Sequence, residues 1–163
     1  MTAARGIIHE EFHSRKFASS GGTLEMMQLW VNIPSKYKMS PPRYQEILKG
    51  AIPVVETESG QVRVIAGEYE GIKGAAKTWS PIVLWDVTIK EGKTFHVTLP
   101  EDYNCSLFLR KGSITTCGST ITLHQVAILS REGNTFDIQA VGGDVNVFLL
   151  GGEPLDEPIA AQG

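Results

Sequence analysis

Short apolar segments separated by turn-forming residues fill the second half of the chain, and this pattern limits the fold more than any other feature. Apolar and polar residues alternate in Val87–Lys90 and again in Phe95–Leu99. Links that contain glycine, such as Lys111-Gly112 and Gly142-Gly143-Asp144, separate the segments. A period of two is typical of strands that bury one face, so we predict an all-β sandwich or barrel. Four more segments continue the pattern: Thr120–Leu123, Val126–Ser130, Phe136–Val141 and Val145–Leu150.

One short helix is expected among these strands. Two prolines precede it, Gly50 ends it, and Tyr44, Ile47 and Leu48 form an apolar stripe at the i, i+3, i+4 spacing of a helix. The pattern therefore predicts a connector helix over residues 43–50 between two β regions.

Two further strands are expected near the N-terminus, over Arg5–Phe12 and Met26–Pro34, with the polar stretch Ser14–Thr23 between them. A lone pair of strands is marginal in water because it cannot bury its apolar face. These strands should therefore belong to a larger sheet.

Charge and composition disfavour several classes of function. The 163 residues contain 15 Lys and Arg against 18 Asp and Glu, and Arg15-Lys16 is the densest basic cluster. Nucleic-acid binders usually show a basic excess, so direct nucleic-acid binding is not expected. No run of 18 apolar residues occurs, and the N-terminus lacks the order of a signal peptide. We therefore expect a soluble cytoplasmic protein without a membrane association.

Three stretches of the sequence carry a family resemblance. They read, in chain order, TAARGIIHEE, LEMMQLWVNIPSKYKMSPPRYQEI and GGEPLDEPIAAQG. Together they resemble the pirin family of two-domain cupins, from the first residue of the chain to the last. The resemblance implies a cupin double-stranded β-helix, a jelly-roll-like barrel. Residues 1–42 would be the end of the first cupin domain, 43–50 the connector helix and 51–163 the second cupin domain.

The family pattern also predicts that the chain is truncated at both ends. Met1-Thr2-Ala3 matches an interior position of full-length relatives, which carry a histidine-x-histidine motif before it. Relatives also continue beyond the position of Gly163 into a C-terminal helix. We therefore expect the chain to be a portion of a two-domain cupin, or bicupin, without the segment that supplies two of the metal ligands.

The resemblance implies a metal site at His9 and Glu11. Residues two apart on a strand project to the same face, so both side chains can point into a barrel while Glu10 points outward. Imidazole nitrogen and carboxylate oxygen suit Fe(II) and other divalent transition metals. The family implies that they are two of four ligands in a three-histidine, one-glutamate site. Two ligands alone hold a metal weakly, so weak or absent binding is expected here.

The remaining candidate side chains are expected to have structural roles. His13 should lie on an exposed loop, and His96 and His124 should be surface or rim histidines. Cys105 and Cys117 are too few for a disulfide framework or a zinc site of their own and are expected to be buried or partly buried, inert thiols.

Two functions stay open for the chain. One is a metal-dependent dioxygenase of the quercetinase type, which the resemblance implies for full-length relatives and which would act on a flavonol or another catechol-like molecule. The other is a non-enzymatic regulator that binds a protein partner in response to the redox state of its metal. The incomplete ligand set predicts that this chain is not active alone.

Self-association is expected through the N-terminal strands. Unpaired strand edges are templates for pairing with another chain, and apolar patches usually mark an interface. The alternative is a monomer in which residues 1–42 fold back onto the second domain. The side chains expected to be buried against a second copy are Met26, Leu29, Trp30, Val31 and Ile33.

Overall fold

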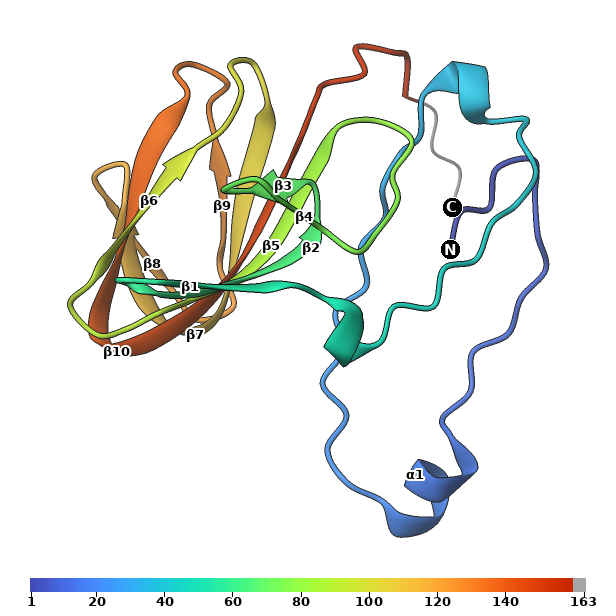
Figure 1. The fold of residues 1–163 in the computed structure, drawn as a ribbon, viewed down its shortest axis with the longest axis horizontal. Helices are drawn as coiled ribbons and strands as arrows, with labels where there is room; N and C mark the ends of the chain where they lie inside the picture. The colour runs from blue at the N-terminus through green and yellow to red at the C-terminus, as the bar shows by residue number, and fades with distance from the viewer. Residues whose placement is uncertain (160–163) are drawn as a thin grey trace. The chain divides into compact units, whose positions relative to one another are not determined.

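The computed structural model describes residues 1–159 and divides into two units, Met1–Gln45 and Glu46–Gly163. Unit 2, as we call Glu46–Gly163, holds all ten strands (Figure 1). They are β1 (Val54–Thr57), β2 (Gly60–Ala66), β3 (Glu68–Tyr69), β4 (Ile72–Lys73), β5 (Ile82–Ile89), β6 (Thr94–Thr98), β7 (Asn104–Thr116), β8 (Ser119–Thr122), β9 (Val126–Leu129) and β10 (Thr135–Gly152).

Two long strands, β7 and β10, organise the fold of unit 2. Residues 145–152 of β10 pair with β5, which pairs with β2 and through it with β1. Residues 135–139 of the same strand pair with β6 instead. β7 likewise pairs with β9 through residues 105–108 and with β8 through residues 113–116. Both strands therefore pass from one layer of an antiparallel sandwich to the other, which confirms the all-β, jelly-roll-like cupin fold.

The bends of these strands fall at two links that the sequence pattern presents as turns. Lys111-Gly112 lies inside β7, and Gly142-Gly143-Asp144 lies inside β10, where the register with β7 shifts. Gly112 has a φ of +84°, and a Cβ there would come within 2.6 Å of the Val145 side chain. Glycine is needed at this bend because only glycine combines that backbone conformation with that close approach.

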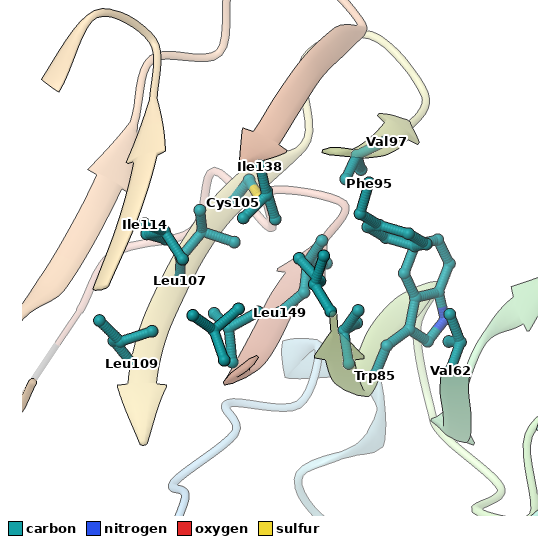
Figure 2. Packing of buried hydrophobic residues seen from close by; sticks show 14 of the residues in the cluster. Val62, Trp85, Phe95, Val97, Cys105, Leu107, Leu109, Ile114, Ile138 and Leu149 are labelled. Carbon is teal, nitrogen blue, oxygen red and sulfur yellow. The ribbon is translucent and has the colours of Figure 1, made fainter. Parts of the chain in front are cut away.

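The hydrophobic core lies between the two layers of unit 2. β2 alternates between buried and half-buried residues along its whole length, as expected for a strand with one core face. Figure 2 shows the packing, in which Trp85 lies beside Phe95, and the ring of Tyr69 meets Trp85 edge-on at 5.0 Å. The largest fully buried side chains are Ile89, Leu107, Leu109, Ile114, Ile138, Leu149, Val62, Val64, Val87, Val97, Val145 and Val147.

The segment expected as a connector helix over 43–50 is not a helix in the structure. It contains a single 3-10 turn, Lys49–Ala51, and residues 44–48 have no regular structure. Tyr44 and Leu48 of the expected apolar stripe are both mostly exposed. So short a helix is stable only when its apolar face packs on something, and this stripe has no such burial.

Residues 1–45, which we call unit 1, hold no strand where two were expected. Arg5–Phe12 and Met26–Pro34 are irregular, and the one β-bridge joins Thr2 to Arg43. Backbone that lacks a neighbouring strand cannot form a ladder of hydrogen bonds, so apolar residues in these segments are not sufficient to make strands. The polar stretch between them instead contains the helix α1 (Arg15–Ser20), whose Phe17 N–H donates to the Ser14 hydroxyl at 3.1 Å. The remaining regular element is the 3-10 turn Ser35–Tyr37.

The described residues contain no helix that is long and apolar enough to cross a membrane.

The β7–β8 turn contains a strained residue, Cys117. It has a φ of +46° and is followed by Gly118 with a φ of +73°, a pair of left-handed conformations that favours Asn-Gly. We expect Cys117→Asn to raise the free energy of unfolding by about 1 kcal/mol, since the left-handed conformation costs asparagine less. Thermal denaturation followed by circular dichroism should show a midpoint roughly 4 °C higher.

Ser119→Asn is the matched control for this turn, because Ser119 follows the two left-handed residues and is not itself among the positive-φ positions. It should leave the midpoint unchanged or lower it. An unchanged midpoint in Cys117→Asn would show that the turn is not strained.

Candidate functional site

The two residues expected to bind a metal lie together in unit 1. Nε2 of His9 is 3.9 Å from Oε1 of Glu11, and both side chains are largely exposed. The segment belongs to no strand, so the proximity of the two side chains does not come from the strand geometry that the sequence pattern predicts. The separation is longer than a hydrogen bond, which leaves both atoms available to a ligand between them.

The donor set of this pair fits part of a metal centre. Nitrogen and oxygen ligands lie roughly 2.0–2.2 Å from a bound transition metal, so two neighbouring ligands are about 2.8–3.6 Å apart. The His9–Glu11 separation of 3.9 Å is slightly longer, so these exposed side chains would move closer together by a few tenths of an ångström to share a metal. No group of three or more His, Cys, Asp and Glu that could hold a metal occurs in residues 1–159. The pair therefore supplies two donors, and a complete site needs others.

The other three histidines have surroundings of their own, different from those of the His9–Glu11 pair. The ring of His13 contacts that of Phe17 at 5.5 Å, at the start of α1. His96 on β6 is exposed, and its Nδ1 is 2.6 Å from Oδ1 of Asp137 on β10. His124 lies in the turn between β8 and β9 with a φ of +67°. His96 and His124 both lie at the surface, as expected. The Asp137 partner of His96 could not be predicted from the sequence, because only the pairing of β6 with β10 brings the two residues together.

The two cysteines differ in their surroundings. Cys105 on β7 is buried, and burial raises the pKa of its thiol to about 12, with a smaller contribution from Cys117. Such a thiol stays protonated at neutral pH and is a poor nucleophile. Cys117 is exposed, so the expectation of a buried or partly buried thiol is wrong for this residue, since the turn places it at the surface.

A buried charged cluster on unit 2 is the one polar constellation that sequence reasoning missed. Asp86 on β5 is 6% exposed. Its Oδ2 lies 3.2 Å from Nη1 of Arg63 on β2 and 3.7 Å from Nη1 of Arg110 on β7. Its Oδ1 accepts a hydrogen bond of 2.7 Å from Nδ2 of Asn146 on β10. The carboxylate thus joins four strands, and Arg110 also lies over the ring of Phe148. We interpret this arrangement as a structural tie, because it links four strands through one buried carboxylate.

Known proteins resemble this chain in both sequence and structure. Residues 84–163 match the pirin C-terminal cupin domain. A Pseudomonas aeruginosa protein named "Putative quercetin 2,3-dioxygenase PA2418" is 47% identical over the whole chain, which covers 57% of that protein. The crystal structure of quercetin 2,3-dioxygenase from Acinetobacter baumannii superposes with a TM-score of 0.87 at 41% identity, covering 93% of this chain and 54% of that one.

A more distant structure is that of the Escherichia coli pirin YhhW in complex with nickel(II). It superposes with a TM-score of 0.50 at 14% identity over 57% of this chain and 39% of that one, which shows a shared fold alone. The chain spans little more than half the length of the first curated relatives that it matches. The matched domain, the identities and the cupin topology together show that the chain belongs to the pirin family.

Proposed function

We propose that this chain contributes two ligands, His9 and Glu11, to the metal centre of a quercetin 2,3-dioxygenase-like pirin. The observation that supports the proposal is the 3.9 Å separation of His9 Nε2 and Glu11 Oε1, two exposed side chains of suitable donor chemistry. Similarity to proteins named quercetin 2,3-dioxygenases points to a flavonol, or another catechol-like molecule, as the substrate. A divalent transition metal held there would supply open coordination positions for such a substrate and for oxygen.

The chain's own residues have limited parts in this site. His9 would coordinate through the Nε2 lone pair, which requires its proton on Nδ1. Glu11 would coordinate as a carboxylate and offset part of the metal's charge. Because affinity grows with the number of preformed ligands, the chain alone should bind the metal weakly and should not cleave a flavonol.

Nickel titration tests the two ligands directly. Isothermal titration calorimetry of the full chain with NiCl2 should show one weak site, and His9→Ala or Glu11→Gln should weaken it by about tenfold or more. His13→Ala and Glu10→Gln are matched controls, because each removes a neighbouring group of the same chemistry. They should leave the affinity unchanged.

Equal affinity in the His9→Ala variant and the unmodified chain would contradict the assignment of this ligand. Oxygen consumption with quercetin adds a separate readout on the same samples. The nickel-loaded chain should show none. Turnover that His9→Ala abolishes would show that the ligand set is complete in this chain, and the partial-site proposal would then fail.

A non-enzymatic regulator that binds a protein partner is the second candidate. Unit 1 exposes large apolar side chains, among them Ile8, Trp30 and Phe12, all more than 80% exposed. Exposed apolar residues in one segment favour an interaction surface. Nickel-dependent binding to a partner, without oxygen consumption, would support this candidate over the dioxygenase.

A further inference from the structure

A cavity of about 360 Å³ opens in unit 2, and His9 and Glu11 are not among its lining residues. Its walls come from β7, β8, β9 and the start of β10, from the β7–β8 turn, and from the segments that precede β7 and β10. Several of its side chains also pack against the hydrophobic core, so the cavity is an extension of the core that opens outward. The residues that matter for its chemistry are Cys105, Thr116, Ile121, Ala127, Leu129 and Phe136.

The inner wall of the cavity is apolar and contains aromatic rings. Ile121, Ala127, Leu129, Phe136 and Tyr103 line it and contact the core cluster. Phenylalanine and tyrosine rings favour stacked or edge-on contacts with another ring, and a thiol contacts a ring edge favourably. Cys105, which Figure 2 shows beside Ile138, supplies such a thiol at the buried end. The wall is therefore suited to an aromatic ligand.

The charge of the lining excludes one class of ligand. Among the lining residues, all of which the structure describes, Glu132 is the single acidic side chain, and no lysine, arginine or histidine occurs. An anion that entered would lose its hydration without gaining a cationic partner. A neutral molecule meets no such cost.

One polar group points to hydrogen bonding inside the cavity. The Thr116 residue is 3% exposed and lines the cavity. Its hydroxyl donates only to the Cys117 sulfur, at 3.8 Å, and sulfur is a weak acceptor. Buried hydroxyl groups generally have better partners than this. A hydroxyl group on a ligand would provide one.

The size of the cavity limits the ligand further. A dry protein cavity of about 150 Å³ is enough to bind benzene. The cavity here is more than twice as large. Two fused rings with a small substituent would fill it better than a single ring.

We propose that this cavity is a binding site for a neutral, hydroxylated aromatic molecule of about two fused rings, formed by residues other than the proposed metal ligands. The ring would lie against Phe136, Leu129 and Ala127, and the ligand's hydroxyl would bond to Thr116. Binding is non-covalent, because the buried Cys105 thiol stays protonated and Cys117 lies at the exposed rim. The site is independent of His9 and Glu11, so it does not rest on the dioxygenase proposal.

2-Naphthol is the probe for this site, and 2-naphthoate is its charged counterpart with the same rings. Titration of the full chain, followed by calorimetry, should give a dissociation constant for 2-naphthol on the order of 100 μM. 2-Naphthoate should bind at least about tenfold more weakly. Absence of saturable 2-naphthol binding, or equal binding of the two probes, would overturn the proposal.

Two variants on β9 test whether 2-naphthol binds inside the cavity. Ala127→Phe fills it with a ring and should abolish 2-naphthol binding. Val126→Phe adds a ring on the same strand at a residue that does not line the cavity, so binding should persist. Ser119→Phe fills the cavity from β8 and replaces Ala127→Phe if that variant unfolds, with Thr120→Phe as its control. Equal binding in the filled and control variants would refute the cavity site.

Alkylation of Cys117 provides a readout that needs no variant. Iodoacetamide should modify Cys117 and leave Cys105 unmodified, as peptide mass spectrometry can show, because Cys105 is buried. Saturating 2-naphthol should slow the modification of Cys117, since both occupy the same cavity. An unchanged rate at saturation would place the bound probe elsewhere and contradict the proposal.

Discussion

Asp86→Ala is expected to lower the free energy of unfolding by about 3–5 kcal/mol, the usual cost of removing one partner from a buried ion pair. The carboxylate is almost fully buried and lies between Arg63 and Arg110. Its loss leaves two guanidinium groups near each other without their anion and leaves the Asn146 amide without its 2.7 Å acceptor. Urea denaturation followed by tryptophan fluorescence measures the change.

The exposed pair of His96 and Asp137 is the control for this experiment. Its atoms are closer, at 2.6 Å, but both side chains are more than 60% exposed. Exposed pairs contribute roughly 0–1 kcal/mol, so Asp137→Ala should have a small effect. Similar losses in the two variants would show that the burial of Asp86 does not determine its contribution.

Replacing members of the buried cluster with apolar residues tests whether the fold requires the charged pair itself or only requires that no buried charge is left without a partner. Asp86→Leu combined with Arg63→Met removes the carboxylate and one guanidinium together. Such replacements of buried pairs are often neutral or stabilising, so the double variant should recover much of the loss in Asp86→Ala. No recovery would indicate that Arg110 or Asn146 depends on the carboxylate more strongly than Arg63 does.

The strand pattern of unit 2 could be predicted because it depends on residues that are close in sequence. Alternation placed Val87 and Ile89 on the face opposite Asp86, and both are fully buried in the core. What the pattern could not show is that Asp86 is buried too. Its partners Arg63 and Asn146 are 23 and 60 residues away, and strand pairing alone brings them together.

Contacts between residues far apart in the sequence also explain two wrong expectations: the turns at glycine-containing links and the strands near the N-terminus. Gly112 and Gly142-Gly143 are local signals for turns, yet neighbouring strands continue the ladder past them, so β7 and β10 are long and bent. Residues 5–12 were expected to form a strand, but they have no partner strand and form none. His9 and Glu11 lie 3.9 Å apart, but the strand expected to carry them is not formed, and their role as metal ligands stays a prediction.

Leu149→Ala should lower the free energy of unfolding by about 3–5 kcal/mol, whereas Trp30→Ala should change it by less than roughly 0.5 kcal/mol. Leu149 on β10 is fully buried in the core of unit 2, and its removal leaves a cavity among packed side chains. Trp30 in unit 1 is 92% exposed, so its larger side chain has few contacts to lose.

Urea denaturation monitored by circular dichroism at two protein concentrations measures both changes. A large loss in Trp30→Ala that grows with concentration would mean that Trp30 is buried against a second copy, as the self-association hypothesis requires. A small loss at both concentrations would place the stability of the chain in unit 2 and exclude Trp30 from a stabilising dimer interface.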